Sequence, residues 1–297
     1  EYLIEPEDVL ENLPKKKKDI NKYSSGKVLT IAGSGAFPGA ALLASSAELK
    51  TGTGASILCF PKSLRKLIFK KTSELVVVSY NDEGKEFLTK ENIKEFDKKI
   101  EWADVVAIGP GLGREQETQE AVLNIIKSRK AKRMVIDADA VFALNNNRYK
   151  KLNLKGYVLT PHQGEFADLI GITVQELKKD ILLYGKKFVS DTGSFLVLKG
   201  APTIIFTPGG DALINTTGNA GMAKFGTGDV LTGAIAGLLS QIKDVENAAI
   251  AAVYIHSLAA DLLLQDFTEF GYTAGDIINK LPAAIKFLRK SILPEED

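Results

Sequence analysis

The chain has 297 residues, 45% of them hydrophobic and 25% charged, a composition typical of a globular protein with one large domain or two. Its 38 lysines and arginines nearly balance its 37 aspartates and glutamates, so it lacks the basic excess of most nucleic-acid-binding domains. The single cysteine, Cys59, excludes an intrachain disulfide and favours a reducing, cytoplasmic compartment.

The first residues, EYLIEPEDVLENLP, are acidic and amphipathic, which is unlike a signal peptide. They do not begin with Met, so we expect either that a start segment was removed or that the chain is one domain of a longer protein. The run Lys15–Lys18 is interpreted as a solvated approach to the first strand, with a nucleic-acid patch as the alternative. Apolar stretches such as 247–264 are interrupted by polar residues and fall short of the ~20 residues of a membrane span.

Short apolar runs alternate with longer segments of helical periodicity from about residue 26 onward. The runs are β-branched and lack strict alternation, which is typical of strands buried on both faces of a parallel sheet. The predicted strands are 28–32, 55–60, 75–80, 105–108, 134–136, 157–160 and 195–198. Two further runs, 203–207 and 212–215, flank the turn sequence PGG and predict a hairpin at the sheet edge.

The predicted helices are 41–51, 118–130, 163–171, 174–192, 229–241, 245–266, 274–280 and 283–290. Alternation of strands and helices predicts a three-layer α/β domain, with helices on both faces of a mostly parallel sheet. No Pro/Ser-rich linker, low-complexity tract or internal repeat divides the sequence, so we expect residues 1–297 to form a single domain.

Glycine-rich or polar segments follow five of the predicted strands. They are GSGAFPGAA (33–41), GPGLGR (109–114), DADA (137–140), PHQGE (161–165) and KGAPT (199–203). In open parallel sheets, ligands bind in the crevice beyond the carboxyl ends of the strands. Together the five segments predict a crevice lined for a polar, phosphate-bearing ligand.

The segment GTGD, Gly226–Asp229, lies directly before a predicted apolar helix. Glycines let backbone N–H groups point into a concavity, and a helix N-terminus adds partial positive charge, so this segment is a candidate anion site. Capping of the helix by Asp229 is the simpler interpretation of this short motif alone. The alternative is that Asp229 acts as a general base on a hydroxyl held against a phosphate.

The other glycine-rich segments match no established phosphate loop. GSGAFPGA and GPGLG fit neither G-x-G-x-x-G nor G-x-x-x-x-G-K-[ST], and each alone is interpreted as a tight strand-to-helix turn. Two histidines and one cysteine cannot assemble a typical zinc site. G-x-S-x-G is absent, and no Ser/His/Asp or Cys/His nucleophile has support in the sequence.

The segment PHQGE places two polar side chains where a helix is expected to begin at Thr160 or Pro161. His162 could hydrogen-bond a ligand, and Glu165 could orient a metal–water cluster, although acids are also common in a first helical turn. The second histidine, His256, falls within a predicted buried helix and is interpreted as a hydrogen-bonded core residue.

For three charged side chains at the ends of other strands, the sequence leaves two possible roles open. Asp137 and Asp139 could hold Mg²⁺ through water, with capping of the next helix by Asp139 as the alternative. Lys199 could offer its ammonium to a phosphate or lie in solvent.

These segments resemble the motif series of the ADP/ATP-dependent NAD(P)H-hydrate dehydratases, a branch of the ribokinase-like superfamily. The motifs are VLTPHQGEFADLIG, IGPGLGR, VIDADA, LKGAPTII and TTGNAGMAKFGTGDVLTGAIAGLL, and their order and spacing match from about residue 4 to 292. The last motif is the specific one, because it separates this branch from thiazole and sugar kinases. The resemblance implies a three-layer ribokinase-like fold.

The resemblance also implies a repair reaction on a damaged cofactor. The substrate is NADH or NADPH hydrated at the nicotinamide C5–C6 double bond, and ADP or ATP phosphorylates the C6 hydroxyl. Phosphate then leaves and the dihydronicotinamide is restored. Phosphorylation is needed because hydroxide is a poor leaving group near neutral pH.

Carried over by position, the resemblance assigns roles to individual residues. Asp229 matches the catalytic base, and Gly226, Thr227 and Gly228 match the anion hole for the transferring phosphate. The implied nucleotide-binding residues are Lys199, Gly200, Ala201, Pro202, Thr203 and Gly228. The implied substrate-binding residues are Ala40, Ala41, Gly113, His162, Asn219 and Asp229. Mg²⁺ would bridge the nucleotide phosphates, with Glu165 as the candidate for its water shell.

The sequence departs from the family pattern at two positions. Asn21 stands where the family often has His, and Gln163 stands where Pro is usual. We expect these changes to alter the grip on the dinucleotide and not the reaction.

The resemblance further implies partners. The chain could be the carbohydrate-kinase-like C-terminal half of a bifunctional repair enzyme, or act beside a separate NAD(P)H-hydrate epimerase. A homo-oligomer is expected, with a tetramer as the first candidate and the apolar segment 245–266 as either core or interface. Neither nucleic acid nor a membrane is expected as a partner.

Two other functions fit the residues. A ribokinase-type kinase acting on a vitamin precursor or sugar alcohol shares GxGD, but no strand-rich insertion of the sugar-kinase lid kind interrupts the early strands and helices. A non-catalytic nucleotide-binding module would follow if Asp229 were only a cap.

Overall fold

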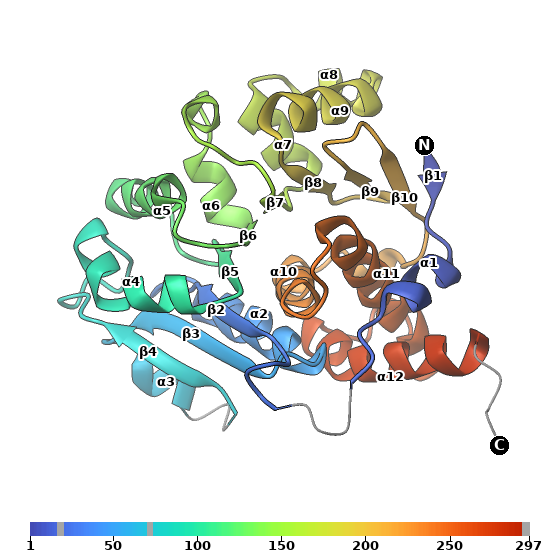
Figure 1. The fold of residues 1–297 in the computed structure, drawn as a ribbon, viewed down its shortest axis with the longest axis horizontal. Coiled ribbons are helices and arrows are strands. Elements are labelled where there is room, and N and C mark those ends of the chain that lie inside the picture. Colours follow the sequence, from blue (N-terminus) through green and yellow to red (C-terminus); the bar gives the residue numbers. More distant parts are fainter. Residues whose placement is uncertain (17–20, 70–73, 293–297) are drawn as a thin grey trace.

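The computed structural model describes residues 1–16, 21–69 and 74–292, and its strands form one ten-stranded sheet (Figure 1). The order across the sheet is β1-β10-β9-β8-β7-β6-β5-β2-β3-β4. The strands are β1 (Tyr2–Leu3), β2 (Lys27–Ile31), β3 (Ala55–Pro61), β4 (Val76–Tyr80), β5 (Val105–Ile108), β6 (Met134–Ile136), β7 (Val158–Leu159), β8 (Phe195–Leu198), β9 (Thr203–Phe206) and β10 (Ala212–Asn215). All seven strands predicted for the parallel part are confirmed to within two residues at either end.

Across the sheet, in the order β8-β7-β6-β5-β2-β3-β4, each adjacent pair of strands is parallel. Beyond β8, the predicted hairpin is confirmed as the antiparallel pair β9 and β10. Its predicted place at the sheet edge is wrong, because β1 pairs with β10 in parallel and takes the edge position. The first residues of the chain therefore form the edge strand of the sheet, next to the hairpin of the C-terminal half (Figure 1).

Helices cover both faces of this sheet, as predicted (Figure 1). One face carries α4 (Ile93–Trp102), α5 (Gln116–Ser128), α6 (Ala138–Ala143), α7 (Gln163–Ile170), α8 (Val174–Lys179) and α9 (Ile181–Thr192). The other carries α1 (Pro6–Asn12), α2 (Pro38–Lys50), α3 (Arg65–Phe69), α10 (Thr227–Leu239), α11 (Val245–Leu263) and α12 (Ala274–Ile292).

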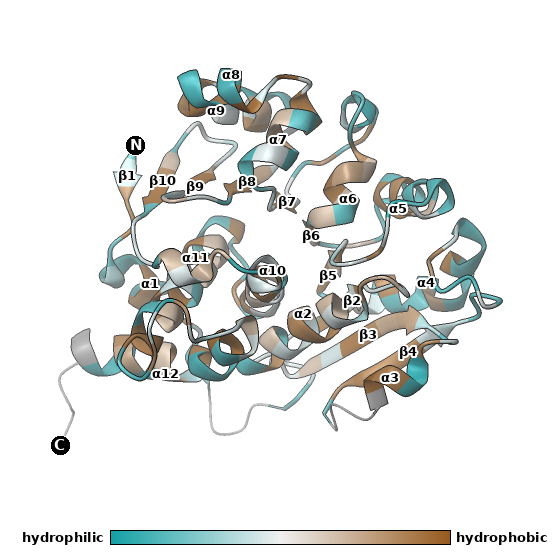
Figure 2. Cartoon of the chain, turned by 180° about the vertical axis from the view of Figure 1, so that it is seen from behind, coloured by the Kyte–Doolittle hydropathy of each residue, from teal (hydrophilic) through white to brown (hydrophobic). Residues whose placement is uncertain are grey.

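The strands are apolar on both sides because each side faces its own core. Along β2, Leu29 and Ile31 pack with Phe96 of α4, whereas Val28 packs in the second core with Ile235 of α10. Figure 2 shows the result, with hydrophobic colour on the strands and hydrophilic colour on the outward sides of α5 and α8. Burial of apolar surface in both layers is the main force that holds the sheet in place.

The predicted helix over 174–192 is wrong in one respect, since the structure has two helices there. The chain leaves the helical conformation at Asp180, whose Oδ1 accepts a hydrogen bond from the Leu183 N–H at 2.9 Å. Asp180 thus caps α9, and a side chain that competes with the helix backbone in this way favours a helix boundary.

The predicted division of the last helix at residues 280–283 is also wrong. Helix α12 continues through Pro282, although proline removes one backbone hydrogen bond from a helix interior. The buried side chains Ile278, Leu281, Ala284 and Leu288 lie on both sides of the proline. Their packing offsets the local cost and keeps the helix continuous.

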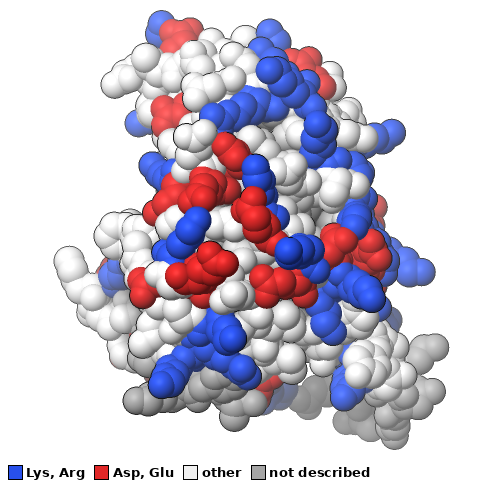
Figure 3. Space-filling view, turned by 90° about the vertical axis from the view of Figure 1, so that its left-hand side faces the viewer, with Lys and Arg blue, Asp and Glu red and all other residues white. Residues whose placement is uncertain are grey.

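The remaining predictions concern surface and assembly. Helix α11 is largely buried within the chain itself, so the predicted apolar segment contributes to the core. Within the described residues, no helix combines the length and apolarity that a bilayer span requires. Of the lysine run, Lys17 and Lys18 lie outside the described residues. On the face drawn in Figure 3, basic and acidic side chains are interspersed.

Candidate active site

The N-terminus of α10 is built around glycine. Gly226 is the N-cap residue with a φ of 90°, and a Cβ atom added to it would lie 2.6 Å from Leu43 Cδ1. Both the left-handed backbone and the close approach of α2 therefore favour glycine at this position. The helix begins at Thr227, whose N–H donates to the Lys224 carbonyl at 3.4 Å, while the Gly228 and Asp229 N–H groups have no carbonyl partner within the helix.

Asp229 is the third residue of α10, and the capping interpretation is wrong. The cap position belongs to Gly226, and no hydrogen bond or ion pair joins the Asp229 carboxylate to another described residue. The pKa of Asp229 is raised to about 7, mainly by burial and then by the charge of Asp137, while the charge of Lys199 acts in the opposite direction. A carboxylate that is half-buried, unpartnered and titrates near neutral pH has the properties of a general base.

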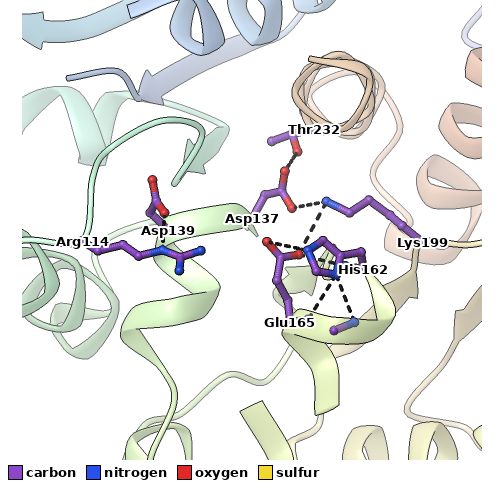
Figure 4. Close-up of polar contacts among 8 residues, drawn as sticks. Arg114, Asp137, Asp139, His162, Glu165, Lys199 and Thr232 are labelled. Carbon is purple, nitrogen blue, oxygen red and sulfur yellow. Dashed lines mark hydrogen bonds and ion pairs between the residues drawn. The ribbon is translucent and has the colours of Figure 1, made fainter. Parts of the chain in front are cut away.

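Lys199 lies at the end of β8, beside this helix N-terminus. Its Nζ is 2.7 Å from Asp137 Oδ1 and 4.0 Å from Glu165 Oε2 (Figure 4). Burial would lower the pKa of Lys199, but the neighbouring carboxylates outweigh it and the net pKa is raised. The ammonium stays charged and lies near the predicted anion site, where a Cβ on Gly228 would be 3.3 Å from Nζ.

Asp137 follows β6 and is the most buried charged group of the site, with its side chain 1% exposed. Its second oxygen, Oδ2, accepts a hydrogen bond of 2.7 Å from Thr232 Oγ1 on α10 (Figure 4). Both carboxylate oxygens are therefore taken by protein groups. This arrangement does not fit the predicted role of Asp137 in holding Mg²⁺.

His162 and Glu165 form the start of α7. The helix predicted over 163–171 is confirmed, because His162 is the N-cap and the helix begins at Gln163, whereas the alternative start at Thr160 or Pro161 is wrong. His162 Nδ1 accepts hydrogen bonds from the Gly164 and Glu165 N–H groups, at 3.0 and 3.2 Å. Glu165 Oε2 accepts one in return from the His162 N–H at 2.8 Å, which makes a capping box.

The donor set around Glu165 fits a Mg²⁺ ion carried by a nucleotide. Among the described residues, no three His, Cys, Asp or Glu side chains are arranged to hold a metal by themselves. Mg²⁺ in phosphoryl-transfer sites usually takes one or two carboxylates, with phosphates and water as its other ligands. Glu165 Oε1 makes no hydrogen bond with a described residue and lies 3.6 Å from His162 Nε2, which leaves it available.

The loop after β5 is held by the predicted DADA segment. Asp139 Oδ2 accepts a hydrogen bond from the Gly113 N–H at 2.9 Å, and its Oδ1 lies 3.1 Å from Arg114 Nε (Figure 4). The predicted capping role of Asp139 is therefore wrong, since Asp137 occupies the N-cap position of α6. Asp139 instead fixes the glycine-rich loop.

The substrate-binding residues predicted in α2 lie beside the same loop. A Cβ on Gly111 would lie 2.9 Å from the Ala40 Cβ, so the α2 N-terminus and the loop after β5 are in close contact. Ala41 is fully buried in the core between α2 and α3. Of the pair, Ala40 is thus the residue with exposed surface.

Asn219 has its side chain committed to the loop before α10. Its Oδ1 accepts hydrogen bonds from the Gly221 N–H and the Tyr272 hydroxyl, and its Nδ2 donates to Asp261 Oδ1 at 3.0 Å. Lys224 strengthens the same loop, since its Nζ donates to the carbonyls of residues 269, 270 and 272. The loop before α10, which carries the predicted anion site, is therefore held at several points.

The predicted nucleotide segment, 199–203, lies between β8 and β9. Gly200, Ala201 and Pro202 are exposed, and Thr203 Oγ1 donates to the Gly200 carbonyl at 3.1 Å. Gln163 lies against this segment, since a Cβ on Gly200 would be 3.1 Å from its Nε2. The departure from the family pattern at Gln163 thus falls next to the nucleotide segment.

His256 is buried and hydrogen-bonded, as predicted. Burial lowers its pKa to about 4, so the ring is neutral, and Nε2 donates to the Thr227 carbonyl at 3.1 Å. This hydrogen bond connects α11 to the first turn of α10.

Sequence reasoning missed several residues that hold the site together. Thr232 and Lys224 lie within the motif at 216–239 but were given no role, and Asp261 and Tyr272 lie outside every motif. Only Thr232 had a usable signal, because a residue three positions after Asp229 lies on the same face of a helix.

Comparisons with known proteins agree with this geometry. Residues 28–283 match the family model described as NAD(P)H-hydrate dehydratase. The chain is 33% identical over 280 residues to the ADP-dependent (S)-NAD(P)H-hydrate dehydratase of Bacillus subtilis, covering 94% of this chain and 96% of that protein. A crystal structure of the Bacillus subtilis ADP/ATP-dependent NAD(P)H-hydrate dehydratase, co-crystallised with ATP and Mg²⁺, has a TM-score of 0.81 at 29% identity and covers 97% of this chain and 98% of that one.

The chain is also 35% identical over 281 residues to the bifunctional NAD(P)H-hydrate repair enzyme of Moorella thermoacetica, covering 94% of this chain and 53% of that protein. It spans about half the length of the bifunctional relatives that it matches.

The sheet order and the similarity to solved structures define a ribokinase-like α/β protein, which confirms the predicted fold class. Within that class, the chain belongs to the NAD(P)H-hydrate dehydratase family.

Proposed function

We propose that the chain is an ADP- or ATP-dependent NAD(P)H-hydrate dehydratase, a carbon–oxygen lyase. The observation that carries the proposal is the Asp229 carboxylate, which is unpartnered among the described residues and has a pKa of about 7 at the N-terminus of α10. A carboxylate in this position can take a proton from a hydroxyl while the N–H groups beside it hold a phosphate.

The reaction has two stages. Asp229 accepts the proton of the C6 hydroxyl as the hydroxyl oxygen attacks the terminal phosphorus of the nucleotide, whose bridging oxygen leaves with its electron pair. The C6–O bond then breaks, phosphate departs with that electron pair, and C5 loses a proton. The C5–C6 double bond of NADH or NADPH is restored. Phosphorylation converts a poor leaving group into a good one.

The phosphate site would consist of Gly226, Thr227, Gly228 and Lys199. The first three supply backbone N–H groups at a helix N-terminus, and Lys199 supplies a fixed positive charge. Gly200, Ala201, Pro202 and Thr203 would contact the rest of the nucleotide. Glu165 would hold the water shell of Mg²⁺, which neutralises phosphate charge when it is bound.

The hydrate would lie on the opposite side of Asp229. We assign Ala40, Ala41, Gly113, His162 and Asn219 to that side, with Ala41 and Asn219 acting through the backbone that they hold in place. His162 is 60% exposed at its side chain, so its ring can meet a ligand while Nδ1 caps α7.

Partners and location belong to the same proposal. We propose a homo-oligomer, with a tetramer as the first candidate, and a fused or separate epimerase that supplies the reactive hydrate epimer. A cytoplasmic location is proposed from the single, buried Cys59. Light scattering on the purified chain measures the oligomeric state directly.

The proposal is tested by near-ultraviolet absorbance of purified NADH hydrate mixed with the protein, Mg²⁺ and either ADP, ATP or no nucleotide. We expect the dihydronicotinamide band to return only when a nucleotide is present, and the more effective nucleotide names the phosphoryl donor. A stable phosphorylated product without return of the band would identify a kinase and overturn the proposal.

A further inference from the structure

Three elements of the fold meet at one buried carboxylate. Asp137 follows β6, Lys199 follows β8, and Thr232 lies in the second turn of α10. The Asp137 carboxylate contacts Lys199 Nζ through Oδ1 and the Thr232 hydroxyl through Oδ2, both at 2.7 Å (Figure 4). These segments are 62 and 95 residues apart along the chain, so the carboxylate joins distant parts of the fold.

The arrangement is more specific than a generic ion pair. A buried charge is unfavourable unless its partners satisfy it, and Asp137 is 1% exposed with a partner for each oxygen. A hydroxyl on α10 is not needed to neutralise Lys199. It is needed to fix where the carboxylate lies, and therefore where the ammonium lies.

Thr232 also carries a link to the catalytic residue. It lies three positions after Asp229 on α10, on the same side of the helix. Two hydrogen bonds therefore connect the Lys199 ammonium, through the Asp137 carboxylate, to Thr232 on the helix that also carries Asp229. The same hydrogen bonds thus fix the position of the ammonium relative to the helix that carries the proposed base.

We propose that Asp137 is a positioning residue that registers the Lys199 ammonium against the α10 helix, with Thr232 as its anchor. The inference rests on the proposed function, in which Lys199 meets the transferring phosphate. Asp137 itself does not touch substrate. Its contribution is to hold the ammonium at the place where charge develops during phosphoryl transfer, and small displacements of such a group are costly to the rate.

The catalytic test compares Thr232→Val, Thr232→Ser and Asp137→Asn. Thr232→Val keeps the shape and charge of the site but removes the anchor, and we expect kcat to fall about tenfold while the Kd for ADP is unchanged. Thr232→Ser keeps the hydroxyl, and kcat should return to the wild-type value. Asp137→Asn should lower kcat about 100-fold without weakening ADP binding.

A second readout does not depend on turnover. Acetylation of Lys199 by an amine-reactive ester, followed by peptide mass spectrometry, reports how firmly its ammonium is held. We expect faster acetylation of Lys199 in Asp137→Asn than in wild type. Lys224, which is held by backbone carbonyls elsewhere, is the matched internal control and should acetylate at an unchanged rate.

The two readouts separate this inference from the proposed function. If the wild-type protein does not dehydrate the hydrate, the proposed function fails, and the acetylation rates still decide whether Asp137 holds Lys199. The inference is overturned if Lys199 acetylates at the wild-type rate in Asp137→Asn. It is also overturned if Thr232→Val retains wild-type kcat, or if Thr232→Ser is as impaired as Thr232→Val.

Discussion

Two carboxyl groups in this protein share a raised pKa of about 7 but lie in different regions. Glu48 is at the end of α2, fully buried, and accepts hydrogen bonds from Ser56 and Thr30 on the sheet. Asp229 is at the start of α10, half-buried and without a partner among the described residues. Burial is the main cause of both shifts, so a raised pKa alone does not mark the active site.

The difference lies in what the carboxyl faces. The polar atoms of Glu48 are used inside the protein, and its raised pKa acts on stability. Asp229 lies in the first turn of α10, where the charge of Lys199 acts on it, and we propose that its raised pKa serves the reaction. Variants at these two carboxyl groups and at their neighbours should therefore differ in whether they change turnover or stability.

The largest effect is expected from Asp229→Asn. Loss of the base should lower kcat about 10³-fold, while ADP affinity measured by calorimetry stays close to wild type because the anion site is intact. Glu48→Gln is the matched control, since it neutralises a carboxyl of similar pKa and should retain turnover. Turnover by Asp229→Asn at the wild-type rate would show that the base assignment is wrong.

The next effect is expected from Lys199→Met. Removal of the ammonium should lower kcat about 10²-fold and weaken ADP binding, because one charged donor to the phosphates is lost. Lys186→Met is a suitable control, since that lysine pairs with Glu1 and belongs to α9. Unchanged nucleotide affinity in Lys199→Met would place the phosphates elsewhere.

A smaller effect on stability is expected at Glu48. Glu48 has a pKa of about 7 in the folded protein, whereas the ordinary pKa of a free glutamate side chain is 4.5. Wild-type stability should therefore be greatest below that lower value and fall as the pH rises toward 7, by up to about 3 kcal/mol from this group. Denaturant unfolding across this range should show a shallower dependence for Glu48→Gln. Equal slopes for the two proteins would contradict the raised pKa.

The smallest effect is expected at Asp139. Asp139→Ala removes both the hydrogen bond to the Gly113 N–H and the partner of Arg114, whereas Asp139→Asn keeps an acceptor for the N–H. We expect KM for the hydrate to rise about tenfold in the alanine variant and less in the asparagine variant, with kcat little changed. A fall in kcat without a change in KM would assign Asp139 to the chemical step.

Much of the fold was predictable because local signals were strong. The apolar runs placed the parallel strands, and GTGD marked the start of α10 to within a turn. The break at Asp180 and the continuity through Pro282 were missed, since each depends on a balance between a local preference and tertiary packing. The edge position of β1 was missed because a strand of two residues, Tyr2–Leu3, has no periodicity to read.

The candidate site was predictable in its residues and not in its contacts. Lys199 and Asp137 stood out as charged residues after apolar runs, and Asp229 stood out as the carboxylate of GTGD before an apolar helix. Their roles depended on pairings across the sheet, such as that of Lys199 with Asp137, which no sequence spacing encodes. Asp137 and Asp139, which were predicted as Mg²⁺ ligands, instead make hydrogen bonds within the protein. Asp137 contacts Lys199 and Thr232, and Asp139 contacts the Gly113 N–H.

The most direct test of the central claim is the pH dependence of kcat/KM for NADH hydrate at fixed, saturating nucleotide. An Asp229 base with a pKa of about 7 predicts that the rate constant falls as the pH drops through that value, because the carboxylate becomes protonated. A profile that stays flat down to the ordinary aspartate range would contradict the claim that this unpartnered carboxylate is the base.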